Sequence, residues 1–229
     1  MAIEKLATHR IGLIHAVAVA VAPVNNAFAT MWPEAMVTNL LDDSLSSDLT
    51  AAGGQNAAIQ DRILNLGNYV RDSGADAVLY TCSAFGMAID LAKPKLRVPA
   101  LKPDEAMIDQ AFDISRDSNG GTIGVLATFE PALPGTQQQF EERAAQRGIP
   151  LHIVMHHVPD AMEALRQGDG ERHDALIAAA AREMTGCACL VLAQFSMARA
   201  RRQVEAVQRA PVLTSPEAAV AKLRQLLGA

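Results

Sequence analysis

Cys82 is the residue of this chain whose type and position point most directly to chemistry. It lies in the segment Thr81-Cys82-Ser83, directly after the apolar run Ala77–Tyr80. A thiolate is a base and a nucleophile, and the N-terminus of a following helix, with the amides of Ser83 and Ala84, favours a thiolate and binds a carboxylate. We therefore predict that Cys82 is a base or nucleophile beside an anion site; a small buried cysteine is the alternative.

His15 is the second catalytic candidate. It follows the apolar run Ile11–Ile14. In a sheet of strand order 2-1-3-4 the first and third strands are neighbours about 5 Å apart, so that His15 and Cys82 end adjacent strands, with Asp42 and Asp43 on the far side of His15. An acid, an imidazole and a thiol in this order form an activated nucleophile. A helix cap or a contact to a substrate carboxylate are the other interpretations of His15.

The remaining cysteines and histidine pairs are predicted to be structural. Cys187 and Cys189 alternate within the apolar stretch GCACLVLA, so we expect both to pack in the core or against a helix. His156 and His157 would point to opposite faces of a strand, which disfavours a metal site. The sequence also contains no glycine-rich phosphate loop, so neither a metal nor a nucleotide cofactor is expected.

Composition excludes several functional classes. Half of the 229 residues are apolar and 20% are charged, which allows a sizeable core and disfavours disorder. The net charge of −5 gives no basic field for a nucleic-acid backbone. Three cysteines do not make a disulfide framework, and no apolar run reaches the length of a membrane span.

The N-terminal stretch resembles a signal peptide, because MAIEKLATHR carries charge and precedes the apolar IGLIHAVAVAVAP. We interpret it instead as a buried first strand that leads into a loop of small residues, since His15 interrupts it and a similar pattern recurs in mid-chain. The expected protein is soluble and cytoplasmic.

Short apolar runs alternate with helical patterns along the chain, which is typical of parallel βαβ units. Strands are predicted at Ile11–Ile14, Val37–Leu41, Ala77–Tyr80, Val98–Leu101, Thr122–Leu126, Leu151–Met155, Cys189–Leu192 and Pro211–Leu213. Helical patterns lie between them, for example at Ala57–Ser73, Pro103–Arg116, Gln137–Gln146, His173–Thr185 and Pro216–Leu227.

The chain contains an internal duplication. RIGLI begins at Arg10, and the similar segment TIGVL begins at Thr122. The offset between these two starts recurs for two further pairs: GADAVLYTC and GCACLVLAQ begin at Gly74 and Gly186, and RVPALKPDEA and RAPVLTSPEA begin at Arg97 and Arg209. Three segments in one register indicate two copies of an α/β half.

We therefore expect two pseudo-symmetric, flavodoxin-like halves, each a short parallel sheet flanked by helices, with the active site in the cleft between them. The first domain is predicted at residues 1–102 plus 214–229, and the second at 103–213. Ligands of such sheets bind beyond the carboxyl ends of the strands. The repeat offset places Gln194 at the position of Cys82, with Thr128 one residue beyond the counterpart of His15.

Over its whole length, the chain resembles the aspartate/glutamate/hydantoin racemase superfamily. The resemblance rests on the duplicated halves, the Thr81–Ser83 turn, the strand end Ile123–Thr128 and the turn Leu192–Met197. It implies a cofactor-independent, dimeric enzyme in which two cysteines, one from each half, move a proton at the carbon next to a carboxylate. Cys82 matches the first cysteine, and Ser83 and Thr128 fall near positions that hold the substrate carboxylate.

The chain departs from the family pattern at the second cysteine, where Gln194 stands. Glutamine forms hydrogen bonds but does not titrate. Relatives that resemble this case include an arylmalonate decarboxylase with one active cysteine, which lies in the other half, and maleate isomerases that use cysteine as a nucleophile.

Three functions follow from these residues. The first is Cys82-mediated racemisation or isomerisation of a small acid or amino acid, with His15 as the second proton-transfer group and Ser83, Ala84, Thr128, Gln194, Phe195 and Ser196 as substrate-binding residues. The second is a cysteine-nucleophile hydrolase, lyase or decarboxylase. The third is an inactive carboxylate-binding relative.

Overall fold

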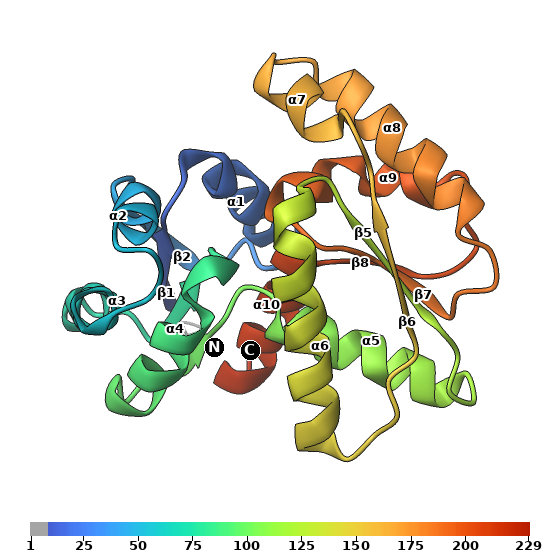
Figure 1. Cartoon of the computed structure of the whole chain (residues 1–229). Coiled ribbons are helices and arrows are strands. Elements are labelled where there is room, and N and C mark those ends of the chain that lie inside the picture. The colour runs from blue at the N-terminus through green and yellow to red at the C-terminus, as the bar shows by residue number, and fades with distance from the viewer. Residues whose placement is uncertain (1–8) are drawn as a thin grey trace, which may run out of the picture. The chain divides into compact units, whose positions relative to one another are not determined.

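The computed structural model describes residues 9–229, which form two compact units (Figure 1). Residues 1–8, the charged start of the signal-like stretch and of the predicted first domain, lie outside the described residues. Of the described residues, unit 1 comprises 9–103 and 219–229, and unit 2 comprises 104–218. The chain therefore passes between the units twice, and the second passage lies within the last helix.

Unit 1 contains a four-stranded parallel sheet of order β2-β1-β3-β4. Its elements are β1 (Arg10–His15), η1 (Ala18–Ala20), α1 (Val21–Met31), β2 (Met36–Leu41), α2 (Leu45–Ala51), α3 (Ala57–Asp72), β3 (Ala77–Tyr80), η2 (Ser83–Phe85), α4 (Gly86–Ala92), η3 (Lys93–Lys95) and β4 (Ala100–Leu101), where η denotes a 3₁₀ helix. Every residue of β3 is buried, as expected of a central strand covered on both faces.

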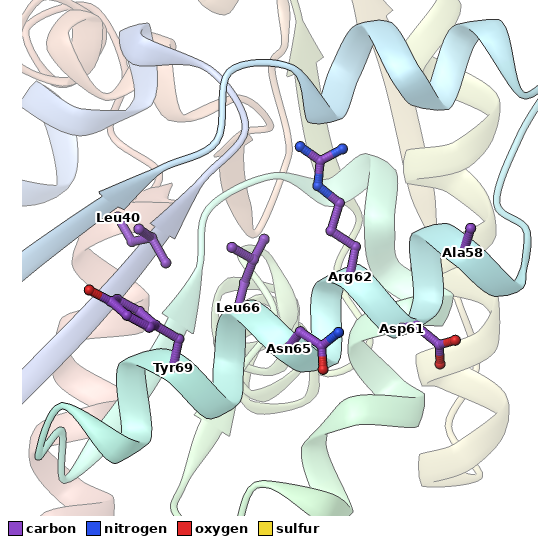
Figure 2. Close-up of a pocket in the computed structure, with 7 residues that line it drawn as sticks. All are labelled: Leu40, Ala58, Asp61, Arg62, Asn65, Leu66 and Tyr69. Atoms are coloured by element: carbon purple, nitrogen blue, oxygen red, sulfur yellow. The ribbon is translucent and has the colours of Figure 1, made fainter.

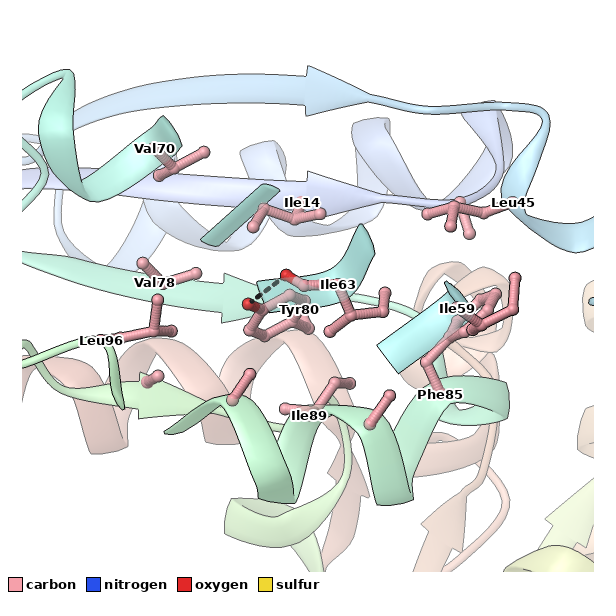
Figure 3. Close-up of a cluster of buried hydrophobic side chains, with 14 of the residues drawn as sticks. Ile14, Leu45, Ile59, Ile63, Val70, Val78, Tyr80, Phe85, Ile89 and Leu96 are labelled. Atoms are coloured by element: carbon pink, nitrogen blue, oxygen red, sulfur yellow. Dashed lines mark hydrogen bonds between the residues drawn. The ribbon is translucent and has the colours of Figure 1, made fainter. Parts of the chain in front are cut away.

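One face of this sheet packs on α3 and α4 (Figure 3). Ile14, Val78 and Tyr80 point from the strands into this core, where they meet Ile63 of α3 and Ile89 of α4. The Tyr80 hydroxyl donates a hydrogen bond of 3.1 Å to the Ile63 carbonyl. This bond fixes the end of β3, two residues before Cys82, against α3.

Unit 2 repeats the sheet with the order β6-β5-β7-β8, all parallel. Its elements are α5 (Glu105–Asp117), β5 (Ile123–Ala127), η4 (Glu130–Ala132), α6 (Leu133–Arg147), β6 (Ile153–His157), α7 (Ala161–Arg166), α8 (Gly170–Glu183), β7 (Cys189–Leu192), η5 (Phe195–Ala200), α9 (Arg201–Glu205), β8 (Val212–Thr214) and α10 (Ser215–Leu227). Helices α5 and α6 cover one face through Val125 and Val191. Helix α8 covers the other through Leu126 and Leu190.

The predicted α/β class with two similar halves is confirmed, and the repeat extends to single hydrogen bonds. The Thr81 amide donates to the Ile14 carbonyl at 3.0 Å, and at the equivalent positions of unit 2 the Ala193 amide donates to the Leu126 carbonyl at 2.9 Å. The 3₁₀ turns η1 and η4 begin at equivalent positions of the repeat, as do η2 and η5. The duplication therefore includes the strand ends.

Several local predictions were incomplete. The small residues after β1, predicted as a loop, form η1 and α1. Their alanines and valines carry no periodic polar face, so the sequence pattern did not indicate a helix. The structure also contains the short helices α2, α4, α7 and α9, which are not among the examples named from the sequence. Cys187 precedes β7 instead of lying within it.

No helix within residues 9–229 is both long enough and apolar enough to cross a membrane.

Candidate active site

Cys82 lies where β3 ends and η2 begins. Its backbone is extended (φ −126°, ψ 117°) and it occupies the N-cap position of η2, so the helix that the sequence predicted after it starts as a 3₁₀ turn. The side chain is half-buried. It lines a cavity of about 10 Å³, room for one water molecule, whose other walls are mostly apolar. Those walls are Ile14, His15, Ala16, Leu45, Ile63, Tyr80, Phe85 and Ile89.

The turn after Cys82 is held by Gln55, which precedes α3. The Gln55 side chain donates to the Ala84 carbonyl and accepts from the Ala88 amide, both at 2.9 Å. Ser83 and Ala84 themselves are exposed. One carboxamide thus fixes the turn that carries both predicted substrate-binding residues of unit 1, a role that the sequence pattern did not reveal.

His15 is completely buried at the end of β1. Its Nε2 lies 2.9 Å from Asn39 Oδ1, and its Nδ1 lies 2.8 Å from Thr81 Oγ1. Because an amide oxygen only accepts, Nε2 carries the proton and Nδ1 accepts from the Thr81 hydroxyl. Burial lowers the pKa of His15 below its usual value, and the Asn39 bond opposes this more weakly. His15 is therefore a neutral imidazole at pH 7, linked to the residue before Cys82.

The predicted neighbours of His15 are arranged differently from the acid–imidazole–thiol order. Arg62 of α3 reaches the loop after β2 (Figure 2), where its Nε and Nη2 donate to the Asp42 carboxylate at 2.8 and 2.6 Å. The same guanidinium binds Asp48. Asn39, not Asp42, holds the imidazole, because Asn39 points from the strand β2 itself while Asp42 lies beyond its end. Asn39 was not predicted, because nothing in the sequence marks a polar residue of an edge strand as a partner of His15.

Residues of α3 and β2 line a hollow with a volume of about 460 Å³. Figure 2 draws the residues that line it. Leu40, Leu66 and Tyr69 line it together with Arg62. It belongs to the outer edge of the sheet, and none of its lining residues is a predicted site residue.

Thr128 and Gln194 come together in unit 2. Gln194 Oε1 accepts from the Thr128 amide at 2.9 Å and from the Thr128 hydroxyl at 3.2 Å. Thr128 is buried. Gln194 Nε2 is also buried and has no hydrogen-bond partner within residues 9–229. A buried donor without a partner is costly, so its presence at a strand end suits a ligand that offers an oxygen.

Sheet register makes Gln194 the counterpart of Cys82. Tyr80 pairs with Ile14 and Leu192 pairs with Leu126, so each residue stands two positions after the last paired residue of its strand. Gln194 is likewise extended (φ −115°, ψ 147°) and is the N-cap of a 3₁₀ helix. The offset found in the sequence therefore holds in three dimensions within each unit.

The other predicted residues of this turn differ in exposure. Phe195 is nearly buried, whereas Ser196 is partly exposed. Cys189 is fully buried in β7, and burial raises its pKa to about 12, the behaviour expected of a structural cysteine. Cys187 is partly exposed and packs beside the core of α8. No group of three His, Cys, Asp or Glu side chains within residues 9–229 is arranged to hold a metal ion.

A buried polar cluster on α8 and η5 went unnoticed in the sequence. His173 is fully buried, and its Nδ1 lies 2.7 Å from the Asp174 carboxylate. Arg199 Nε donates to both oxygens of that carboxylate, at 2.9 and 3.0 Å. The cluster ties η5, the turn that follows Gln194, to α8. In the sequence, the adjacent residues His173 and Asp174 within a helical pattern are the one sign of this cluster.

Comparison with known proteins connects this arrangement to one family. A family model described as Asp/Glu/Hydantoin racemase matches residues 19–223. No curated protein sequence matches the chain significantly.

Solved structures similar to this chain include several racemases. Allantoin racemase from Klebsiella pneumoniae is 17% identical, with a TM-score of 0.71 over 96% of this chain and 88% of that one. Aspartate racemase from Picrophilus torridus is 16% identical, with a TM-score of 0.68 over 96% and 94%. A glutamate racemase isoform from Bacillus anthracis is 14% identical, with a TM-score of 0.71 over 96% and 82%. These likenesses establish the fold, and the match over residues 19–223 establishes that the chain belongs to the Asp/Glu/hydantoin racemase family.

Proposed function

We propose that this protein is a cofactor-independent enzyme of the racemase and isomerase type, in which Cys82 moves a proton at the carbon next to the carboxylate of a small acid or amino acid. The observation that carries the proposal is the position of Cys82. It is a half-buried thiol at the carboxyl end of β3, where ligands of parallel sheets bind, in a chain of the racemase family. A thiolate there abstracts the proton, and the carboxylate takes up the charge as an enolate.

Thr128 and Gln194 serve as the carboxylate-binding pair in this proposal. Thr128 occupies both acceptor directions of Gln194 Oε1, so the carboxamide is oriented with Nε2 as its remaining donor. A preorganised N–H donor stabilises an oxygen on which negative charge develops. Ser83, Ala84, Phe195 and Ser196 complete the predicted substrate contacts, with the backbone amides near Ser83 as further donors.

Gln194 also favours chemistry with one thiol. A carboxamide does not ionise at neutral pH and so cannot act as a general acid or base, and here its oxygen is already bound to Thr128. Proton return therefore comes from Cys82 itself or from His15. Racemisation by two symmetrical thiols is therefore disfavoured. Isomerisation or decarboxylation, which a single thiol can carry out, is the second candidate function.

His15 acts on Cys82 through Thr81 in this proposal. Both ring nitrogens are engaged, and the shorter bond goes to the hydroxyl of the residue that precedes the thiol. A neutral imidazole that accepts from Thr81 fixes the turn that carries Cys82. Homodimerisation and a cytoplasmic location remain predictions from the family resemblance and the sequence.

Proton exchange in deuterium oxide tests the proposal. Aspartate, glutamate, hydantoins, aryl- and alkylmalonates and maleate are incubated with wild-type protein, Cys82→Ala and the matched control Cys187→Ala, and are followed by NMR. We expect exchange or conversion with wild type and Cys187→Ala, and none with Cys82→Ala.

Two other outcomes separate the alternatives. A covalent adduct on Cys82 without α-proton exchange indicates a nucleophilic hydrolase or lyase. Thermal stabilisation by a compound that neither exchanges nor converts, retained in Cys82→Ser, indicates an inactive carboxylate-binding relative and refutes the proposed catalysis.

A further inference from the structure

The carboxamide of Gln55 takes the place of a backbone hydrogen bond in the helical segment that follows Cys82. In an uninterrupted α-helix that began at Ser83, the Ala88 amide would donate to the Ala84 carbonyl, four residues earlier. In the structure both groups bind Gln55 instead: Nε2 donates to the Ala84 carbonyl and Oε1 accepts from the Ala88 amide, each at 2.9 Å. Gln55 is therefore inserted into the first turn of this segment.

The backbone of the segment is interrupted where the carboxamide enters. Residues Ser83–Phe85 form the 3₁₀ turn η2, and α4 begins only at Gly86. Phe85, the N-cap of α4, departs from helical dihedral angles (φ −106°, ψ 18°). Such an interruption is typical of a side chain that enters the hydrogen-bond ladder of a helix. The 3₁₀ form of the turn thus coincides with the inserted carboxamide.

The loop that carries Gln55 is itself well ordered by local interactions. Gly53 and Gly54 both have positive φ, 68° and 133°, in the region that favours glycine. On the other side, the Asn56 side chain caps α3 by accepting from the Ile59 amide at 3.0 Å. Gln55 is thus held between the end of α2 and the start of α3, so its side chain is preorganised for the turn.

Unit 2 also secures the turn after its third strand, but with another side chain. Arg199 of η5 binds Asp174 of α8. Met87 occupies the position of Arg199 in the repeat and is exposed. Each half therefore ties this turn to a neighbouring helix, and in unit 1 the tie is made by Gln55 at the start of α3.

The titratable side chains beside Cys82 in its cavity are uncharged. His15 and Tyr80 line this cavity together with the thiol. Burial lowers the pKa of His15 and raises the pKa of Tyr80, so both are neutral at pH 7. Next to uncharged side chains, the dipoles of the peptide groups in the turn have a large share in stabilising a thiolate. The reactivity of Cys82 should therefore respond to the conformation of this turn.

We propose that Gln55 is a positioning residue of the candidate active site: by holding the turn in its 3₁₀ form, its carboxamide sets the reactivity of the Cys82 thiol. This inference rests on the proposed function, since it concerns the same site. Fixing the Ala84 carbonyl also fixes the N–H on the far side of the same planar peptide group, which belongs to Phe85. Without Gln55, the Ala88 amide bonds the Ala84 carbonyl directly, the α-helix extends toward Cys82, and the amides of the turn change direction.

The pH profile of Cys82 alkylation tests this inference. Modification by iodoacetamide is followed by peptide mass spectrometry from about pH 5 to 9 in wild type and in Gln55→Met, which keeps the length of the side chain and removes both hydrogen bonds. We expect the rate at about pH 7 to fall about two- to fivefold and the midpoint of the profile to move to higher pH, because the reoriented amides stabilise the thiolate less. Exchange of the α-proton, measured with the compound that wild type turns over, should slow at least as much.

Gln55→Glu supplies a reversible form of the same change. An ionised carboxylate accepts from the Ala88 amide but cannot donate to the Ala84 carbonyl, whereas the protonated acid does both. We expect the Ala88 amide signal in ¹H–¹⁵N NMR spectra to return toward its wild-type position as this carboxyl is protonated, and the alkylation rate relative to wild type to recover with it. Gln167→Met is the matched control and should behave as wild type, because Gln167 is exposed and its side chain binds Glu163 one turn earlier.

The outcomes separate this inference from the proposed function. An unchanged pH profile of Cys82 in Gln55→Met, or an equal change in Gln167→Met, overturns the positioning role. A slower Cys82 in Gln55→Met, with no α-proton exchange of any compound in wild type, refutes the proposed catalysis and leaves the positioning role supported. If Gln55→Met does not fold, Gln55→Glu decides: an alkylation rate that follows the Ala88 amide signal supports the inference, and a rate independent of that signal overturns it.

Discussion

Gly67 of α3 offers a sharp test of how the end of β3 is positioned. It is buried, and a β-carbon at this position would lie 2.8 Å from Leu96 Cδ2 and closer still to the Tyr80 hydroxyl. That hydroxyl donates to the Ile63 carbonyl one helical turn earlier (Figure 3). Gly67→Ala therefore forces Tyr80, Leu96 or the helix itself to move.

The magnitude follows from three opposing contributions. Replacing a mid-helix glycine by alanine stabilises by about 1 kcal/mol through helix propensity. Overpacking a well-filled core costs about 1–3 kcal/mol, and loss of the Tyr80 hydrogen bond costs about 0.5–1.5 kcal/mol. We expect a net loss in the free energy of unfolding of about 0.5–3.5 kcal/mol.

Urea unfolding followed by circular dichroism measures the effect, with Gly135→Ala as the matched control. Gly135 lies in the first turn of α6, is exposed, and has no atom within 4 Å of its would-be β-carbon. That substitution should stabilise by about 0.5–1 kcal/mol. In a Tyr80→Phe background the closest oxygen is absent, so Gly67→Ala should cost less than it does in wild type.

Two results would refute this reasoning. If Gly67→Ala stabilises as much as Gly135→Ala, then α3 does not approach Tyr80 as closely as the structure has it. If its cost is unchanged in the Tyr80→Phe background, then Leu96 alone causes the conflict and Tyr80 does not anchor the end of β3.

Three further predictions concern buried polar groups. Burial lowers the pKa of His15 below its ordinary value of 6.5, so the unfolded chain binds a proton at this residue before the folded chain does. The free energy of unfolding should therefore fall as pH drops through about 6.5. Urea titrations from about pH 7.5 to 5 should show this fall in wild type and a flatter profile in His15→Gln. Asp174→Ala leaves the buried His173 and the exposed Arg199 without their shared acceptor and should destabilise by about 2–3 kcal/mol in the same assay, whereas a change under about 0.5 kcal/mol contradicts the cluster. Cys189, with its pKa raised to about 12, should stay unalkylated by iodoacetamide at about pH 8 until urea unfolds the protein, and modification at the rate of a model thiol would contradict its burial.

The sequence by itself determined the fold class and the duplication. Parallel strands covered on both faces need short continuous apolar runs, and such runs are visible without any knowledge of pairing. The offset common to the three repeated segments then aligned Cys82 with Gln194, because the two halves share their register from strand to turn. Several predicted strand boundaries differ from the observed ones by one or two residues, because hydrogen bonding, and not hydrophobicity, decides where a strand stops.

Only the tertiary structure decided which polar groups meet. The predicted strand order placed Asp42 and Asp43 beside His15. In the structure, the His15 imidazole is hydrogen-bonded to Asn39 and Thr81, and Asp42 is bound by Arg62. Strand pairing and the length of each side chain decide these partners. Likewise, no spacing rule pairs Thr128 with Gln194 across 66 residues. Hydrogen bonds between distant residues depend on distances of a few tenths of an ångström and on orientation, which a linear pattern of residue types does not encode.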